Sequence, residues 1–246
     1  MKICILGDSV AKGILYNEAD GRYVCGKNSF AARLAADGAE VDNISVFGCT
    51  VTKGLQLAQR HIARLESADV ILLEFGGNDC DFHWDQIAAD PDAHHEPNTS
   101  MERYLENYTK LIYLTQGSGA VPLVLNLPPI GAKRYFDRFS VNMDDRGKKN
   151  IIRWLGGDVE YIHRWHKTYN DQLWALTGSL GIPAADIRGE FRQSADYNDF
   201  LCKDGIHPNE EGQMLIYKKL SSLVSSLTLK KTIANTGKVW YNTAVV

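Results

Sequence analysis

The sequence predicts an α/β fold in which helices cover both faces of a parallel sheet. Apolar runs at residues 3–6, 41–47, 70–75 and 121–127, with a weaker run at 182–187, are bounded by Gly, Asn or Pro. The runs do not alternate with polar residues, which is typical of strands buried on both faces. Segments with helical spacing lie between them. Repetition of strand and helix favours a parallel sheet joined by right-handed crossovers.

Four segments have the apolar spacing of amphipathic helices. Their stripes cover residues 55–65, 101–112, 159–176 and 210–223. Thr99 and Glu102 form a capping-box pattern at the start of the second segment. Asp158 is a candidate N-cap of the third, and Asn209 suits the N-terminus of the fourth.

The length of 246 residues and the hydrophobic content of 44% suit one globular domain. We expect this domain to span residues 1–228, with residues 229–246 as a C-terminal strap or partly disordered tail. Residues 79–98 form an acidic loop without Lys or Arg, and residues 128–157 form a basic, aromatic insertion. Long connections are often functional, so both are candidate rims of a site; the alternative is solvated surface.

Charge and cysteine content exclude several classes of protein. The net charge of −3 and the pI near 6.2 give no reason to expect nucleic acid or an anionic membrane as a partner. The sequence shows no signal peptide and no apolar run of about 18 residues, so we expect a cytoplasmic protein without a membrane span. The five cysteines are an odd number without CxxC spacing. They are interpreted as reduced thiols, and neither a disulfide framework nor a zinc site is expected.

Three strand ends carry residues suited to acyl transfer. Ser9 follows the first apolar run, Gly48 follows the second and Asn78 follows the third. Ligands of open parallel sheets bind beyond the carboxyl ends of the strands, so these residues should share one edge. Attack of a serine on an ester places negative charge on the carbonyl oxygen. The backbone N–H groups of Ser9 and Gly48 and the side-chain amide of Asn78 are candidate donors to that oxyanion.

A base for the serine is found far along the chain. Asp204 and His207 are three residues apart in a short turn before the last helix. This spacing allows the carboxylate to reach one imidazole nitrogen while the other faces Ser9, as in a Ser-His-Asp triad. The sequence therefore predicts Ser9, His207 and Asp204 as catalytic residues.

Other interpretations of these residues exist. Ser9 alone suits a cap of the helix or turn after the first strand. A turn containing Gly7, Asp8, Ser9 and Gly13 is compatible with phosphate binding, but it lacks GxGxxG and GxxxxGK spacing and Asp8 would repel a phosphate. The acidic loop also contains carboxylates and imidazoles of the kind that bind divalent cations, in a spacing that matches no known loop. These residues are Asp79, Asp81, Asp85, His83, His94 and His95.

Four blocks of the sequence together resemble the SGNH hydrolases, also called the GDSL esterase/lipase family. The first block is Gly7-Asp8-Ser9-Val10, with valine where leucine is commoner. The second is Gly48, the third is Gly76-Gly77-Asn78-Asp79, and the fourth runs from Asp204 to His207. The blocks span residues 7–207, so the resemblance covers nearly the whole chain.

The resemblance implies a flavodoxin-like three-layer sandwich with a five-stranded parallel sheet, and an enzyme without metal or cofactor. It implies Ser9 as nucleophile, His207 as general base and then acid, and Asp204 as the partner that orients His207. Ser9, Gly48 and Asn78 are then the oxyanion-hole donors. Asp8 is expected to anchor the turn.

The substrate that the sequence favours is a small ester. We expect cleavage of carboxylic esters through an acyl-enzyme, with a short acyl group such as acetyl on a carbohydrate or small polar alcohol. A lysophospholipase or thioesterase of the same family is an alternative, and a non-catalytic doubly wound binding protein is another. Aromatic residues of segment 133–154 suit stacking on a sugar ring, its basic residues suit an anionic acyl carrier, and the aromatics also suit a satellite cluster under the loop.

Overall fold

The computed structural model describes the backbone of residues 1–242 and the side-chain surroundings of residues 1–227. The main sheet contains β1 (Lys2–Gly7), β4 (Glu40–Asn43), β5 (Val70–Glu74), β6 (Val121–Leu125) and β7 (Ala184–Ala185). All pairs are parallel, and the order is β4-β1-β5-β6-β7. This is the flavodoxin-like order, in which the chain changes direction of winding beside the first strand.

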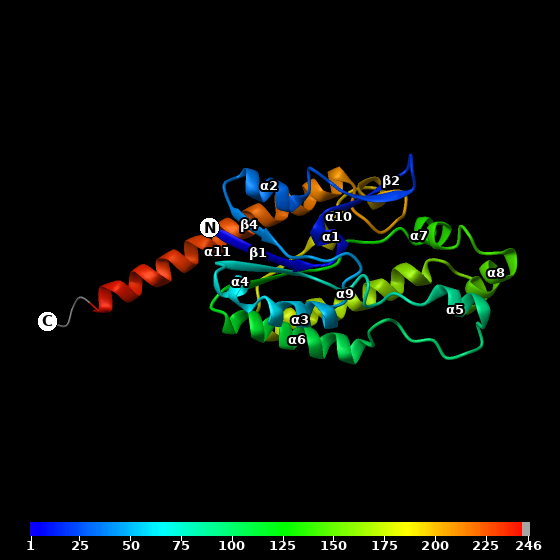
Figure 1. Ribbon diagram of the computed structural model, residues 1–246, viewed down its shortest axis with the longest axis horizontal. Coiled ribbons are helices and arrows are strands. Elements are labelled where there is room, and N and C mark those ends of the chain that lie inside the picture. Colours follow the sequence, from blue (N-terminus) through cyan, green and yellow to red (C-terminus); the bar gives the residue numbers. More distant parts are fainter. Residues whose placement is uncertain (243–246) are drawn as a thin grey trace.

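Helices form a layer on each face of the sheet (Figure 1). One layer contains α3 (Val51–Arg60), α4 (Ile62–Glu66), α6 (Met101–Gly117) and α9 (Tyr161–Leu180). The other contains α1 (Ser9–Lys12), α2 (Phe30–Ala36), α10 (Ile187–Phe191) and α11 (Glu210–Asn242). In β1, Cys4 and Leu6 enter the first core while Ile3 and Ile5 enter the second, so both faces are buried as the sequence predicted.

The remaining elements lie at the carboxyl end of the strands, opposite the projecting end of α11 in Figure 1. They are α5 (Trp84–Ala89), α7 (Ala132–Phe139) and α8 (Asp145–Trp154). A short 3-10 helix, η1 (Tyr197–Phe200), follows α10. Segments 79–98 and 128–157 are therefore partly helical, and their apolar side chains form a third core. We call α5, α7 and α8 the cap.

Several predicted boundaries were wrong. The strand expected at residues 41–47 ends at Asn43, whose side chain takes the Ser45 N–H as a donor (3.0 Å). The strand expected at 182–187 is only Ala184–Ala185. The N-cap of α6 is Ser100, not Thr99, and that of α9 is Glu160, not Asp158. Asn209 does accept from the Gly212 N–H (2.9 Å) at the start of α11.

Two further features differ from expectation. A hairpin of β2 (Ile14–Asn17) and β3 (Arg22–Cys25) was not predicted. The last helix was expected at 210–223, but the backbone stays helical to Asn242, across most of the predicted tail. The end of that tail, residues 243–246, lies outside the described residues. No helix in the described part of the chain is both long and apolar enough to span a membrane.

Candidate active site

The end of β1 places Ser9 at the carboxyl edge of the sheet. β1 stops at Gly7, and α1 begins at Ser9. Asp8 is the N-cap of α1, because its Oδ1 accepts from the Val10 N–H (2.8 Å). The turn is thus anchored by Asp8, as expected, and Ser9 is not its cap. The Ser9 hydroxyl is free to bond elsewhere.

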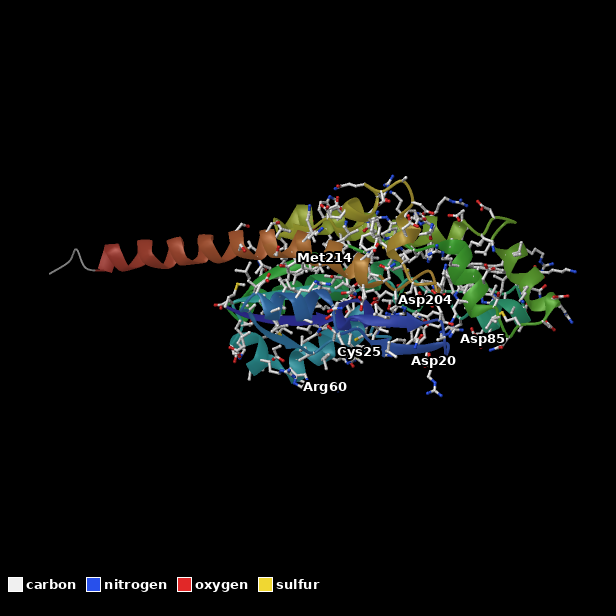
Figure 2. The ribbon with its side chains drawn as sticks, turned by 90° about the horizontal axis from the view of Figure 1, so that it is seen from above. Asp20, Cys25, Arg60, Asp85, Asp204 and Met214 are labelled. Atoms are coloured by element: carbon white, nitrogen blue, oxygen red, sulfur yellow. The ribbon has the colours of Figure 1, made fainter. Side chains whose placement is uncertain are left out.

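His207 and Asp204 belong to one tight turn before α11. Asp204 Oδ1 accepts from the backbone N–H groups of Ile206 (3.1 Å) and His207 (3.2 Å), so the carboxylate holds its own turn together. Gly205 has φ +78°, a left-handed conformation that favours glycine. A Cβ there would lie 2.5 Å from the Gly131 carbonyl oxygen, which leaves no room for a side chain. Figure 2 shows Asp204 between the end of the molecule that carries Asp85 and the helix that carries Met214.

Ser9, His207 and Asp204 form one hydrogen-bonded chain. His207 Nε2 lies 2.8 Å from Ser9 Oγ, and His207 Nδ1 lies 2.5 Å from Asp204 Oδ2. Their exposed fractions are 7% for Ser9, 2% for His207 and 0% for Asp204. The carboxylate accepts the proton of Nδ1, so the lone pair of Nε2 is directed at the serine hydroxyl. The structure brings these three predicted residues together over nearly the whole length of the chain.

Gly48 and Asn78 follow the two strands that flank β1. Gly48 has φ +68° in a turn closed by the bond from Cys49 N–H to Val46 O (3.2 Å), which is a conformation suited to glycine. Among the described residues, no acceptor bonds the N–H of Gly48 or of Ser9. The Asn78 amide lines the cavity beside Ser9. The three predicted oxyanion donors thus follow adjacent strands, and two of them have unused N–H groups.

A buried acidic pair orients Asn78. Asp8 Oδ2 accepts from Asn78 Nδ2 (2.8 Å), and Glu74 at the end of β5 hydrogen-bonds the Asp8 side chain. Burial and the neighbouring Asp8 raise the pKa of Glu74 well above its ordinary value, so Glu74 holds a proton and donates it to Asp8. Sequence reasoning missed Glu74. Its signal was a single acidic residue in an otherwise apolar strand.

A cavity of about 80 Å³ extends from Ser9 and His207 towards the cap. One wall is aromatic and consists of Phe82, Trp84, Tyr135, Tyr161 and Trp165. This volume is several times what a single water needs, so a small organic group fits. Segments 79–98 and 128–157 both contribute residues to the lining of this cavity, and their role as rims of a substrate site stays a prediction.

The aromatic and the basic residues of the insertion lie in different parts of the structure. Tyr135 lines the cavity, while Phe136, Phe139 and Trp154 pack in the third core. Packing of the aromatics in a satellite cluster is therefore confirmed for these three residues, and stacking on a sugar ring stays a prediction. None of the Lys or Arg side chains of segment 128–157 lines this cavity. Arg138 instead lies over the rings of Tyr16 (5.1 Å) and Tyr23 (5.9 Å) of the hairpin.

The unpredicted hairpin covers the imidazole. The Tyr23 ring centroid lies 5.1 Å from that of His207, and the Phe47 centroid lies 6.0 Å from it. These rings shield His207 from solvent. The sequence did contain a hairpin signal at this place, since Asp20-Gly21 is a favoured turn pair and Gly21 has φ +67°.

The acidic loop does not assemble the cation site that was considered. In residues 1–227, no group of three or more His, Cys, Asp or Glu side chains is placed to hold a metal. Asp79 accepts from the Val51 N–H (3.0 and 3.1 Å), and Asp81 accepts from Trp84 Nε1 (2.9 Å) and the Tyr135 hydroxyl (2.7 Å). All five cysteines are free. Burial raises the pKa of the Cys49 and Cys202 thiols to about 11, which argues against a thiolate nucleophile.

Asp79 makes stability depend on pH. Burial raises the pKa of its carboxyl to about 7, well above the ordinary value of an aspartate. The unfolded chain then releases this proton at lower pH than the folded chain, so the free energy of unfolding falls as pH rises from about 4 to about 7. Between about pH 5 and pH 8 the loss approaches about 3 kcal/mol, at about 1.4 kcal/mol per pH unit.

Asp79→Asn should lack this loss, because asparagine keeps an oxygen for the Val51 N–H and does not ionise. Urea unfolding at both pH values should show the difference in free energy of unfolding, variant minus wild type, increasing with pH. Asp20→Asn in the exposed hairpin controls for loss of one negative charge. A difference for Asp79→Asn that is the same at both pH values would contradict the assignment.

The fold and this arrangement define a class of protein. A flavodoxin-like sheet with a hydroxyl, an imidazole and a carboxylate in series at its carboxyl edge is the architecture of a hydrolase. A profile of the GDSL-like Lipase/Acylhydrolase family matches residues 5–215. The chain belongs to this family, whose members act on esters. A sequence search of curated proteins finds no match.

Solved structures of related fold agree with this placement. The lipase/acylhydrolase from Enterococcus faecalis shares 17% identity with a TM-score of 0.59, covering 92% of this chain and 95% of that one. A catalytic mutant of an acetylxylan esterase from Geobacillus stearothermophilus shares 17% identity with a TM-score of 0.58, covering 89% and 91%. LAE5, an alpha/beta hydrolase enzyme from the metagenome of Lake Arreo in Spain, shares 20% identity with a TM-score of 0.62, covering 92% and 95%. At these sequence identities, the similarity shows a common fold.

Proposed function

We propose that the protein is a metal-independent serine esterase that cleaves short acyl esters, such as acetyl esters, of a carbohydrate or another small polar alcohol. The observation that carries the proposal is the Ser9–His207–Asp204 chain beside a cavity that Ser9 and His207 both line. The five free cysteines support a cytoplasmic location, because oxidising compartments favour disulfides.

The proposed reaction has two steps. His207 Nε2 takes the Ser9 proton as Oγ bonds to the ester carbonyl carbon, and the carbonyl oxygen becomes an oxyanion. The N–H groups of Ser9 and Gly48 and the Asn78 amide donate to that oxygen. The C–O bond to the alcohol then breaks, and the imidazolium gives its proton to the leaving oxygen. In the second step His207 takes a proton from a water as its oxygen bonds to the acyl carbon. The bond from that carbon to Ser9 Oγ then breaks, the imidazolium returns the proton to Oγ, and the carboxylic acid leaves.

The size of the cavity favours a small substrate. Its volume of about 80 Å³ and its aromatic wall suit a ring or a short acyl group more than a long chain. One protein of similar fold is an acetylxylan esterase, whose substrate is an acetylated carbohydrate. That similarity adds weight to the carbohydrate proposal.

The experiment is hydrolysis of p-nitrophenyl esters from acetate to long chains, each with and without a chelator. We expect the highest kcat/KM for acetate and no effect of the chelator. Preference for long chains would favour a lysophospholipase or thioesterase, and loss of activity with the chelator would refute metal independence. Hydrolysis of none of the esters would favour the non-catalytic binding protein.

Asn78→Ala tests the oxyanion role. Loss of one such donor typically lowers kcat by about 10²- to 10³-fold. Because the donor acts on charge that develops in the transition state, KM should change little. Asn98→Ala is a matched control, since Asn98 bonds the Asn78 carbonyl (2.9 Å) but does not line the cavity. Equal kcat values for Asn78→Ala and wild type would remove Asn78 from the mechanism.

A further inference from the structure

The cavity contains an imidazole that the proposed reaction does not use. His166 of α9 lines the cavity that Ser9 also lines, with an exposed fraction of 4%. Its Nδ1 lies 3.2 Å from Nη1 of Arg188, a residue at the start of α10. This pair was not predicted, because only the packing of two helices brings its members together.

Arg188 fixes which nitrogen of His166 carries the proton. A guanidinium can only donate, so Nδ1 of His166 must accept. Arg188 also donates through Nη2 to Nε2 of His163 (3.1 Å), whose Nδ1 lies 2.9 Å from the Ile130 carbonyl oxygen. Burial, followed by the charge of Arg188, lowers the pKa of His166 well below its ordinary value. His166 is therefore neutral, with its proton on Nε2.

The Nε2–H is the only N–H group that the His166 side chain can offer to the cavity that it lines. In residues 1–227 no protein atom accepts a hydrogen bond from it, and the only side-chain bond of His166 is the one to Arg188. The atom is not sealed in the core. Fully buried polar side-chain atoms without a partner in this part of the chain are Ser45 Oγ, Glu74 Oε2, Arg138 Nε and Arg188 Nε. The remaining accessible surface of His166 therefore includes a hydrogen-bond donor with no partner.

The neighbours of His166 in the cavity are mostly aromatic or aliphatic, including Trp165, Ile162 and Pro128. A donor in such surroundings is costly to leave unpaired once water is expelled. We propose that His166 is a substrate-binding residue whose Nε2–H donates a hydrogen bond to an ether, hydroxyl or carbonyl oxygen of the group that occupies the cavity. Arg188 acts as the positioning residue. The ligand class is thus an oxygenated small group, which deepens the proposed function and rests on it for the identity of the substrate.

Two pairs of esters test the proposal, because the members of each pair differ only in an oxygen that replaces a methylene. One pair varies the alcohol, as tetrahydropyran-4-yl acetate against cyclohexyl acetate. The other varies the acyl group, as p-nitrophenyl methoxyacetate against the butyrate. Comparing each ratio of kcat/KM between variants cancels the intrinsic reactivity of the esters. His166→Leu should lower the preference for the oxygen-containing member of at least one pair by about fivefold.

His163→Leu is the matched control. It also removes an acceptor of Arg188, but His163 does not line the cavity, so both ratios should stay at wild-type values. His166→Gln, which keeps a side-chain N–H, should recover part of the preference. Wild-type ratios in His166→Leu for both pairs, or equal losses in His163→Leu, would overturn the proposal.

A measurement without catalysis separates this proposal from the proposed function. Nitrogen-15 NMR of histidine-labelled protein should show His166 as the Nε2–H tautomer. Its Nε2–H signal should shift on addition of tetrahydropyran, which has an ether oxygen, and not of cyclohexane, which has none, in both wild type and Ser9→Ala. Absence of that tautomer or of the shift would refute the binding role even if esters are hydrolysed. Its presence in a protein that hydrolyses no ester would refute only the esterase.

Discussion

Ser9→Ala should lower kcat for p-nitrophenyl acetate by about 10⁶-fold, the typical loss when the nucleophile of a serine hydrolase is removed. The hydroxyl lies 2.8 Å from His207 Nε2 and is the atom that would form the acyl-enzyme. Alanine removes one buried hydrogen bond and leaves the Asp8 cap intact, so the melting temperature should change little.

Ser45→Ala is the matched control for this variant. Ser45 is also buried after a sheet strand, but its hydroxyl has no partner and does not line the cavity. Its kcat should equal that of wild type. Ester hydrolysis that survives in folded Ser9→Ala would disprove the serine mechanism, while a loss in both variants would indicate damage to the fold.

Asp204→Asn should lower kcat by about 10⁴-fold with little change in KM. Asparagine retains an oxygen for the N–H groups of Ile206 and His207, so the turn should persist. The amide that replaces Oδ2, however, would donate to Nδ1. The ring proton would then lie on Nε2. A protonated Nε2 cannot accept the proton of the serine.

Asp199→Asn provides the comparison for Asp204→Asn, because Asp199 is exposed and bonds the loop through its backbone: its N–H donates to the Asp196 carbonyl (3.3 Å) and its carbonyl accepts from Asn209 Nδ2 (2.7 Å). Steady-state kinetics of both variants, with melting temperatures as a check on folding, decide the case. If kcat of Asp204→Asn lies within tenfold of wild type, Asp204 does not orient the base.

The sheet and the meeting of Ser9, His207 and Asp204 were predictable because both depend on local patterns. Non-alternating apolar runs located the strands, and the polar residue after each run marked the edge where ligands bind. Strand ends were less predictable. Val46 and Phe47 fit the apolar run of a strand, but their side chains are exposed, and beyond Asn43 only the N–H groups of Ile44 (2.9 Å) and Val46 (3.1 Å) still bond β1.

The cap and the wall of the cavity were not predictable to the same degree. The apolar side chains of α7 are buried by other parts of the cap and not by the sheet. Trp84 of α5, for example, stacks on Phe139 with ring centroids 4.5 Å apart. The pairing of His166 with Arg188, and that of Glu74 with Asp8, depend on tertiary contacts between distant segments. A single sequence carries no signal for such contacts, although an isolated charge in an apolar strand is a reason to look for one.

The turn that carries His207 is physically joined to the cap. The Gly131 N–H, at the start of α7, donates to the Gly205 carbonyl (2.7 Å), and the two segments are too close for a side chain at Gly205. Arg134 adds a bond from Nη1 to the Asn198 carbonyl (2.7 Å). Any exchange of segment 128–157 for that of another protein, in order to alter substrate choice, would therefore also disturb the position of His207. Chimeras of this enzyme would have to keep the contact between Gly131 and Gly205 and change only the residues of the aromatic wall.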